Sequence, residues 1–490
     1  MTVTTSRGAV RGVRRDGVTA YLGIPYATAP AGAARFRPPV PHPPWSGVRD
    51  ATAFGPTAPQ SERKLGAVDM TPYFGDGWHP GDDYLTVNVW TAVPADTARP
   101  VMVFVHGGGF VAGSGSSAVY DGSAFARDGV VLVTLNYRLG IAGFLDLPGA
   151  PPNRGLLDVV AALRWVRDEI AAFGGDPGNV TLFGQSAGAT IVGGVLATPD
   201  AAGLFRRAVV QSGSGLGAFS TEQAAHVTRA AAGLLGAEPH ADAFAGIPDE
   251  RLVEAAGKLG GIDLRTATHH DPLLGLSPFS LVLDTQPAEA VGAGVDLLVG
   301  TNTEEGNLYL VPVGRYATST AADVDAAAAA AHPDPARLVA AYRRHRPAAT
   351  DAEIRSAILG DGLFGAGSWA LSEAHARRAG AGTFAYEFAW RSSALGGELG
   401  ATHTIELPFV FGVTDLPALR GPDKLLGDGT PPAALAAAMH DSWVRFARTG
   451  NPGWPRYDVE RRTTMRFAEE SGPVDDPRGP EREAWAVLGG

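Results

Sequence analysis

Short, almost uninterrupted runs of apolar and β-branched residues recur along this chain, and they constrain its fold more than any other feature. The runs are VMVFV (101–105), VVLVTL (130–135), VTLFG (180–184), AVVQS (208–212) and DLLVG (296–300). Runs of this kind are typical of strands buried on both faces of a parallel sheet. We therefore predict an α/β fold with a central, mostly parallel β-sheet and helices on both of its faces.

Helical and turn patterns lie before and between these runs. Apolar residues recur at helical spacing through NRGLLDVVAALRWVRDEIAAF (153–173), which predicts an amphipathic helix that crosses from one strand to the next. GGDPGN (174–179) predicts a turn, and AGATIVGGVL (187–196) predicts a small-residue helix close to the sheet. The first hundred residues are rich in proline and glycine, so we expect short edge strands and loops there.

We predict a single domain, residues 1–490, with two helix-rich insertions. The stretches at about 220–290 and 320–400 break the alternation of strands and helices, and they are candidate walls of a pocket. The second stretch contains the alanine-rich tract AADVDAAAAAAHPDPA (321–336), which predicts an ordinary helix. The sequence shows no fixed-period repeat, which argues against a solenoid or a propeller.

Charge and cysteine content exclude several classes of function. With 51 acidic and 40 basic residues the formal charge is −11, which repels phosphate backbones, so we expect no nucleic-acid partner. Cysteine is absent, which excludes disulfides, thiolate metal sites and a cysteine nucleophile. No apolar run is long enough to span a bilayer, and the first residues lack the apolar core of a secretory signal. We expect a cytoplasmic protein without a membrane partner; whether a leader was removed stays open.

A candidate nucleophile lies where one predicted strand meets a helix. GQSAG (184–188) fits the pattern G-x-S-x-G, with VTLFG before it and the small-residue helix after it. In this strand–turn–helix context a serine is held at a strained elbow, so we predict Ser186 as the nucleophile. The flanking glycines avoid collisions with nearby backbone, and the Ala187 amide at a helix N-terminus can face developing negative charge. An ordinary turn serine is the alternative.

A second motif offers further backbone amides. HGGGF (106–110) follows the strand VMVFV directly, and consecutive glycines are tolerated where the backbone must approach a ligand closely. We predict an oxyanion hole formed by the amides of Gly108, Gly109 and Ala187. A nucleotide-binding phosphate loop is excluded because no G-K-[ST] follows, and a plain flexible loop is the remaining alternative.

Together these motifs resemble the type-B carboxylesterase family. The resemblance rests on HGGGF and FGGDPGNVTLFGQSAG (173–188), and it extends to YLGIPYATAPAGAARFRPP (21–39), DDYLTVNVW (82–90), NYRLG (136–140) and SWVRFARTGNP (442–452). The family includes bacterial para-nitrobenzyl esterases and cholinesterases. It implies an α/β-hydrolase fold and a serine carboxylesterase that acts on a small-molecule ester through an acyl-enzyme. Acyl transfer of this kind requires no metal and no organic cofactor.

A serine nucleophile needs a base, and the base needs a carboxylate that orients it. The order serine, acid, histidine leaves as candidate bases His332, His345, His375, His403 and His440. The first three lie in polar or arginine-rich helical surroundings, where solvated residues are expected, and the last lies in a helix and is expected to be structural. GATHTIELPFVFG (400–412) is similar to the family's catalytic-histidine segment, so we predict His403 as the base.

The candidate acids follow the strand DLLVG in the segment TNTEEGN (301–307). A carboxylate just beyond a strand's carboxyl end is where a triad member is expected, but residue types do not choose between Glu304 and Glu305. In the family the catalytic acid immediately precedes a glycine, which matches Glu305. Ser212 and Ser214 either support the triad by hydrogen bonds or belong to a structural turn, and both interpretations stay open.

Two departures from the family bear on stability and on substrate choice. Ala58 and Tyr84 replace a cysteine pair that closes an N-terminal loop in many relatives, so we expect packing alone to hold the loop 58–84. Gln185 stands next to the nucleophile where many relatives have glutamate. The missing carboxylate would have attracted a quaternary ammonium group, so we do not expect choline esters as preferred substrates.

The sequence does not identify the substrate or the oligomeric state. Gln185, Phe110, Phe219 and Phe279 are candidate residues of an apolar pocket, with core packing as the alternative for the three rings. Hydrolysis of a thioester, a carbamate or a lactone would use the same machinery. A non-catalytic recognition module is a less favoured alternative, because relatives of that kind have lost the nucleophile, which this chain retains.

Overall fold

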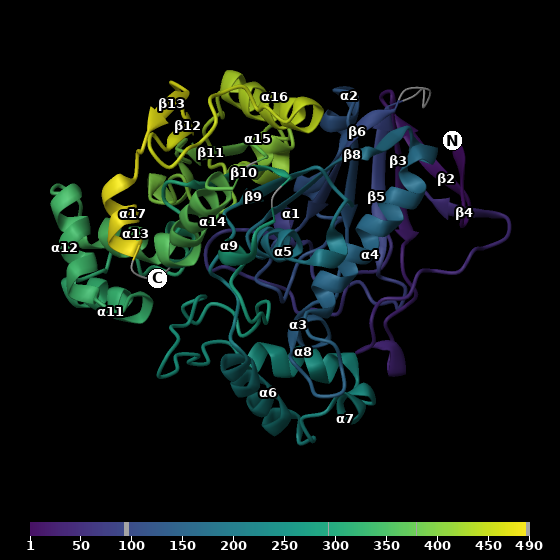
Figure 1. Ribbon diagram of the computed structural model, residues 1–490, viewed down its shortest axis with the longest axis horizontal. Coiled ribbons are helices and arrows are strands. Elements are labelled where there is room, and N and C mark those ends of the chain that lie inside the picture. The colour runs from purple at the N-terminus through teal and green to yellow at the C-terminus, as the bar shows by residue number, and fades with distance from the viewer. Residues whose placement is uncertain (93–97, 293, 379, 487–490) are drawn as a thin grey trace.

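A thirteen-stranded sheet runs through the part of the chain that the computed structural model describes, residues 1–92, 98–292, 294–378 and 380–486. Its strands are β1 (Thr2–Thr5), β2 (Gly8–Arg15), β3 (Val18–Pro25), β4 (Val48–Ala51), β5 (Thr86–Ala92), β6 (Arg99–Val105), β7 (Val131–Leu135), β8 (Gly175–Gln185), β9 (Arg207–Gln211), β10 (Asp296–Asn302), β11 (Thr383–Phe388), β12 (Thr463–Phe467) and β13 (Gly472–Asp475). Their order is β1-β2-β3-β5-β7-β6-β8-β9-β10-β11-β12-β13, with β4 paired to β2 (Figure 1).

The centre of this sheet is parallel, as the continuous apolar runs predict. From β7 through β6, β8, β9, β10 and β11 to β12 each neighbouring pair is parallel. The outer strands pair antiparallel, except that β4 pairs with β2 in parallel. One predicted boundary is wrong. The segment 174–179 is not only a turn, because β8 already begins at Gly175, which pairs with Arg99 before the register shifts.

Helices cover both faces of the sheet, which confirms the predicted α/β class. They are α1 (Thr71–Phe74), α2 (Ser123–Arg127), α3 (Gly140–Phe144), α4 (Arg154–Glu169), α5 (Ala187–Leu196), α6 (Thr221–Leu235), α7 (Ala241–Ala245), α8 (Asp249–Lys258), α9 (Pro287–Ala290), α10 (Asn307–Leu310), α11 (Ala321–Ala331), α12 (Pro335–His345), α13 (Asp351–Gly360), α14 (Ala366–Ala376), α15 (Leu407–Val410), α16 (Ala433–Thr449) and α17 (Gly479–Trp485). A π-helical turn, Asp361–Gly365, joins α13 to α14.

Alternate residues of β6 belong to two different core clusters. Val103 packs in one cluster with residues of α4 such as Leu163. Phe104 packs in the other cluster with residues of α16 such as Trp443. Since successive side chains of a strand point to opposite faces, the sheet is buried on both sides between these two layers.

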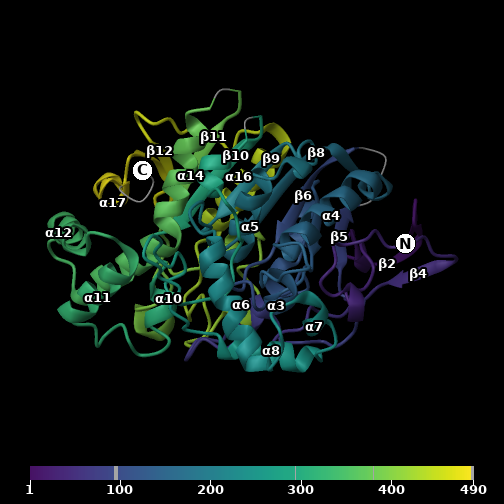
Figure 2. The same cartoon turned by 60° about the horizontal axis from the view of Figure 1, so that its bottom comes forward.

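Helices outside these layers gather in two separate groups, one of α6, α7 and α8 and one of α11 and α12 (Figures 1 and 2). The helix-rich stretches predicted from the sequence are too long. Residues 259–286 contain no helix, and the stretch predicted to be helical up to residue 400 contains β11. All six residues of β11 are buried between parallel neighbours, so long-range pairing sets the conformation of this segment, and the helical pattern before it ends ahead of Thr383.

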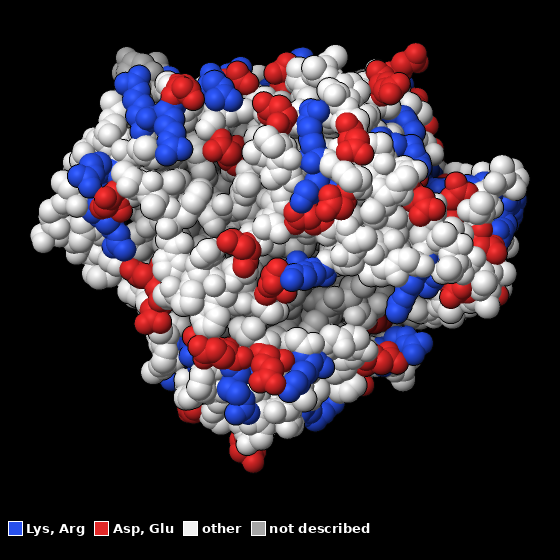
Figure 3. Space-filling model, turned by 180° about the vertical axis from the view of Figure 1, so that it is seen from behind, with Lys and Arg blue, Asp and Glu red and all other residues white. Residues whose placement is uncertain are grey.

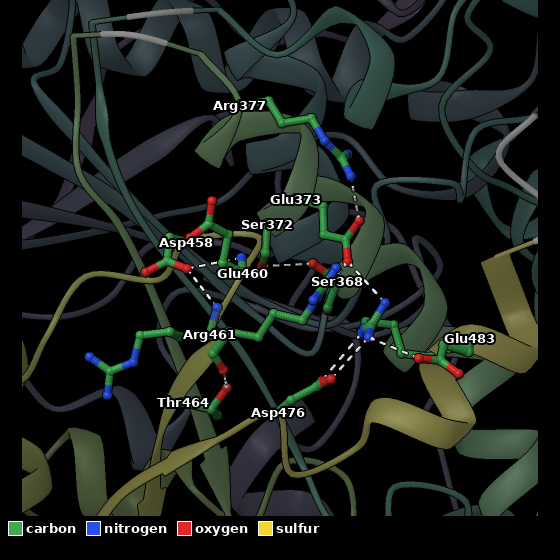
Figure 4. Close-up of polar contacts among 12 residues, drawn as sticks. Ser368, Ser372, Glu373, Arg377, Asp458, Glu460, Arg461, Thr464, Asp476 and Glu483 are labelled. Atoms are coloured by element: carbon green, nitrogen blue, oxygen red, sulfur yellow. Dashed lines mark hydrogen bonds and ion pairs between the residues drawn. The ribbon is translucent and has the colours of Figure 1, made fainter.

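A network of ion pairs fastens the C-terminal segment to α14. Glu373 of α14 accepts hydrogen bonds from Arg377 at 3.0 Å, from Arg462 at 3.0 Å and from Arg482 of α17 at 3.2 Å (Figure 4). Arg482 also donates to Asp476 at 3.0 Å. The network therefore fixes the helix that follows the π-helical turn.

Charged side chains of both signs are interspersed on the face of the molecule in Figure 3, and they form no broad basic area on that face. Within the described ranges, no helix has both the length and the apolar character needed to cross a membrane.

Candidate active site

The sequence motifs meet at the carboxyl edge of the parallel strands. β6 ends directly before His106, the first residue of HGGGF. β8 ends directly before Ser186, β9 directly before Ser212, and β10 three residues before Glu305. The strand registers align these ends, with Gln185 opposite Gln211 and Gln211 opposite Gly300. Parallel strands present their carboxyl ends at one edge, so the sheet brings together residues that are distant in the chain.

The backbone at Ser186 has the strained elbow conformation that the motif predicts. Its φ of 57° and ψ of −127° lie outside the usual regions for a residue with a side chain. The Ser186 amide is held by a hydrogen bond of 2.9 Å to the Gln211 carbonyl. A Cβ atom at Gly188 would stand 2.1 Å from the Val105 oxygen, and one at Gly184 would stand 2.7 Å from Gly188, so both flanking glycines are required.

The predicted serine, histidine and acid lie in hydrogen-bond contact. His403 Nε2 lies 2.9 Å from Ser186 Oγ, and His403 Nδ1 lies 2.6 Å from Glu305 Oε2. His403 and Glu305 are buried, whereas Ser186 is partly exposed to the cavity above it. The chain therefore presents a hydroxyl to a base whose second nitrogen faces a carboxylate.

Geometry separates the two candidate acids that residue types left undecided. Glu304 turns away from the imidazole, forms an ion pair with Arg391, and accepts a hydrogen bond of 2.9 Å from the Ala401 amide. Glu305 contacts His403 directly. The carboxylate that precedes the glycine is thus the one placed to orient the histidine.

Additional contacts hold the acid and the imidazole in place. Ser212 Oγ donates a hydrogen bond of 2.5 Å to Glu305 Oε1, and the Asn302 amide donates one of 2.7 Å to the same oxygen. The ring of Phe364, from the π-helical turn, stacks on the imidazole of His403 with centroids 4.2 Å apart and planes 9° apart. Ser212 therefore forms the hydrogen bond to the acid that was one of its two predicted roles, the other being a place in a structural turn.

A second carboxyl group, Glu406, lies fully buried beside this arrangement and was missed by the sequence analysis. It accepts hydrogen bonds from Asn302 Nδ2 at 2.8 Å and from Gln211 Nε2 at 3.2 Å. Burial, reinforced by the nearby charge of Glu305, raises the pKa of Glu406 from 4.5 to about 7. The sequence feature that could have pointed to Glu406 is its position three residues after His403, in the segment 400–412.

The triple glycine forms a tight loop beside Ser186. Gly108 has φ +119° and Gly109 φ +64°, and a Cβ atom at Gly108 would stand 1.9 Å from the Ala112 oxygen. The Gly108 carbonyl accepts a hydrogen bond of 2.8 Å from Arg63 Nη1, so the N–H of the following Gly109 points the opposite way across the trans peptide. Ala187 begins α5, whose first amides lack intrahelical partners.

These groups line a cavity of about 740 Å³, measured with its open mouth. Its apolar lining residues include Leu65, Tyr73, Phe74, Phe110, Leu273, Leu276, Leu308, Tyr309, Leu363 and Phe364. Gln185 also lines it, with its Nε2 atom 3.3 Å from His403 Nε2. Phe219 and Phe279, by contrast, are buried in the core cluster and do not line this cavity. The backbone of Phe219 pairs with Val282, three residues after Phe279.

Three of the rejected histidines have surroundings that differ from one another. His345 is exposed, as predicted. His332 and His375 are buried, each with 1% of its surface exposed, which corrects the expectation of solvated residues. His375 bonds to Thr383 at 2.7 Å and to the Val295 carbonyl at 2.9 Å, because α14 packs against β10 and β11.

The loop 58–84 is held by polar contacts, not by packing alone. Gln60 donates to the Gly113 carbonyl at 3.0 Å and accepts from the Gly113 amide at 2.7 Å. Asp69 of the same loop forms an ion pair with Lys424. The Gln60 bonds tie the loop to the segment that follows the triple glycine, and the ion pair ties it to the segment around Lys424. These contacts explain how the loop is positioned without a disulfide.

Comparison with known proteins places this arrangement among esterases. The model of the carboxylesterase family matches residues 1–478. The para-nitrobenzyl esterase of Bacillus subtilis (strain 168) is 35% identical over 98% of this chain and 97% of its own length, and the phenmedipham hydrolase of Pseudarthrobacter oxydans is 34% identical over 96% and 95%. A crystal structure of a carboxylesterase from Geobacillus stearothermophilus superposes with a TM-score of 0.85 at 36% identity, covering 99% of both chains.

Proposed function

The chain belongs to the carboxylesterase family, and on that premise we propose that Ser186, His403 and Glu305 form the catalytic triad of a serine carboxylesterase. It has the α/β-hydrolase fold and is a carboxylic ester hydrolase. The observation that carries the proposed triad is the pair of contacts made by His403, 2.9 Å to Ser186 Oγ and 2.6 Å to Glu305 Oε2.

In the first half of the reaction Ser186 attacks the ester carbonyl. His403 Nε2 accepts the serine proton, and Glu305 stabilises the imidazolium that forms. The amides of Gly108, Gly109 and Ala187 donate hydrogen bonds to the carbonyl oxygen as it becomes negative. His403 then gives the proton to the alkoxide of the leaving alcohol, and the acyl group stays on Ser186.

In the second half a water molecule takes the place of the alcohol. His403 accepts a proton from this water as it attacks the acyl-enzyme, and the same amides stabilise the second oxyanion. The proton returns to Ser186 Oγ as the carboxylic acid leaves. Both steps need His403 in its neutral form, because its Nε2 atom must accept a proton in each of them.

Pre-steady-state hydrolysis of para-nitrophenyl butyrate tests this function. The expected result is a burst of nitrophenol equal to one per chain, followed by a slower steady rate, because the acyl-enzyme forms before water releases it. Ser186→Ala should remove the burst, whereas Ser442→Ala, on the surface of α16, should retain it. Hydrolysis that survives unchanged in Ser186→Ala would overturn the proposed function. Matched thioester, carbamate and lactone substrates then define the acyl group that the enzyme prefers.

The same proposal extends to the setting of the enzyme. We propose a small-molecule ester as its partner, a single catalytic domain and a cytoplasmic location. The continuous sheet supports the single domain, and membership of the carboxylesterase family supports the small-molecule ester. The absence of cysteine, with Ala58 and Tyr84 at the family's cysteine positions, supports a reducing compartment. Cell fractionation with antibody detection tests the location, and recovery outside the cytoplasmic fraction would contradict it.

A further inference from the structure

Arg63 stands in the wall of the catalytic cavity. It comes from the loop 58–84, and its Nη1 atom donates a hydrogen bond of 2.8 Å to the carbonyl of Gly108. Its guanidinium also lies over the ring of Phe74, 5.5 Å from the centroid. Arg63 also lines a neighbouring cavity of about 930 Å³, measured with its open mouth, so this residue lies between two open spaces.

Within the described residues, no carboxylate lies within ion-pair distance of Arg63. The neighbouring Glu62 pairs with Lys64 at 3.2 Å instead. Two guanidinium groups that are fully buried are well satisfied by comparison: Arg138 pairs with Asp158 at 2.7 Å, and Arg154 donates to four backbone carbonyls. Arg63 makes one such bond. Arg63 itself is half-buried, and this burial lowers its pKa.

The other described residues of the cavity wall carry no charge that could neutralise the guanidinium of Arg63. The described residues that line the catalytic cavity include no aspartate or glutamate, and half of them are leucine, phenylalanine or tyrosine. Arg63 is the one lining residue whose side chain is permanently charged. A guanidinium with unused N–H donors in apolar surroundings favours a carboxylate, which it can bind with two parallel hydrogen bonds.

Resting on the proposed esterase function, we propose that Arg63 is a specificity-determining residue that binds a free carboxylate of the substrate. The preferred substrates are then esters that carry a carboxylate in addition to the ester group, such as monoesters of dicarboxylic acids. The carboxylate would replace the missing counter-ion while the ester carbonyl occupies the oxyanion hole next to Gly109.

A purely structural role for Arg63 makes a different prediction. If its bond to the Gly108 carbonyl only held the oxyanion loop, replacing it would slow hydrolysis of charged and neutral esters by the same factor. A ratio of kcat/KM between two matched esters therefore separates recognition of the carboxylate from support of the loop.

The test compares para-nitrophenyl hemiglutarate with para-nitrophenyl pentanoate, which differ by the terminal carboxylate. The wild-type protein should hydrolyse the hemiglutarate with the higher kcat/KM, despite the repulsion expected from a net charge of −11. In Arg63→Gln the ratio of the two kcat/KM values should fall by about tenfold or more, the usual scale for a lost charge-assisted hydrogen bond. Lys64→Gln removes the same charge from the neighbouring exposed residue and should leave the ratio unchanged.

Two further measurements keep the result decisive. The para-nitrophenyl esters of hemisuccinate and hemiadipate change the distance between the carboxylate and the ester group, and the pentanoate ester of 4-hydroxybenzoate places the carboxylate on the leaving alcohol. Among all the esters tested, one that carries a carboxylate should show the largest loss of kcat/KM in Arg63→Gln. Thermal unfolding checks that Arg63→Gln folds. If the variant does not fold, the test rests on whether the wild-type protein has a higher kcat/KM for a carboxylate ester than for the pentanoate. A wild-type preference for pentanoate over every carboxylate ester, or an equal loss for all esters in Arg63→Gln, would overturn the role of Arg63. Absence of hydrolysis of any ester by the wild-type protein would instead overturn the proposed function.

Discussion

Ser212 Oγ donates a hydrogen bond of 2.5 Å to the carboxylate of Glu305, on the oxygen that does not face His403. The two residues follow neighbouring parallel strands, β9 and β10, so the sheet itself sets their distance. One oxygen of the acid is therefore fixed by Ser212 and the Asn302 amide, and the other is left for the imidazole. Glu305 is a positioned carboxylate before any substrate arrives.

Ser212→Ala should lower kcat by roughly tenfold, because the loss of one hydrogen bond to a charged group loosens the acid that orients His403. KM for a neutral ester should change little, since Ser212 lies behind the acid and does not line the cavity. Ser214→Ala is the matched control: its hydroxyl bonds to the Leu216 amide and not to the triad. An unchanged kcat in Ser212→Ala would show that the bond has no part in catalysis.

Glutamine substitutions distinguish the two adjacent acids. Glu305→Gln should lower kcat/KM by about 10³- to 10⁴-fold, because an amide cannot stabilise the imidazolium and favours the wrong histidine tautomer. Glu304→Gln loses the ion pair with Arg391 on the outer side of the loop and should retain activity within a few-fold. Steady-state kinetics on one ester checks both variants. Equal losses, or a larger loss at Glu304, would refute the assignment of the acid.

Gly108→Ala should disable the oxyanion loop. The added Cβ would stand 1.9 Å from the Ala112 oxygen at a φ of +119°, so the loop must move and its amides with it. The expected loss in kcat is about 10²- to 10³-fold, as for removal of one oxyanion donor. Gly233→Ala, in α6 with open space around it, should keep full activity and gain up to about 1 kcal/mol of stability. Wild-type activity in Gly108→Ala would contradict the assignment of this loop.

The raised pKa of Glu406, about 7 against an ordinary 4.5, links folding stability to pH. Between these two values the folded state holds the proton more tightly than the unfolded state does. The free energy of unfolding should therefore fall as the pH rises from about 4.5 to about 7. Urea unfolding at a series of pH values should show this fall in the wild type and a flatter profile in Glu406→Gln.

The exposed Glu222→Gln serves as the control for that series and should follow the wild-type profile. The difference between the variant and wild-type curves isolates the buried carboxyl from all other groups that titrate. Parallel curves for Glu406→Gln and the wild type would contradict the prediction, because they would mean that folding does not raise the pKa of this carboxyl.

The sequence predicted the parts of the fold and site that depend on local pattern. The strands of the parallel centre appeared as continuous apolar runs, and Ser186 was identified because a strand leads into its motif and a helix leaves it. The resemblance to a family then selected His403 and Glu305, which no periodicity distinguishes. These residues depend on short segments whose conformation is set mostly by neighbours in the chain.

Features that depend on distant packing were not predictable in this way. Phe364 stacks on His403 because a π-helical turn brings it there, and β11 is a strand because it inserts between β10 and β12. His375 looked solvated from its polar helical neighbours, but its helix packs against the sheet. Arg63 lies in an irregular loop without periodicity, so only the folded chain reveals that it faces the catalytic cavity.

Labelling with a fluorophosphonate tests the central claim most directly, that Ser186 is activated by the residues gathered around it. The reagent should modify wild-type protein at one equivalent per chain, and mass spectrometry should place the adduct on the peptide that contains Ser186. Labelling should be absent in Ser186→Ala and slowed in Glu305→Gln. Modification that persists in Ser186→Ala, or a wild-type protein that hydrolyses esters without being labelled, would contradict the account.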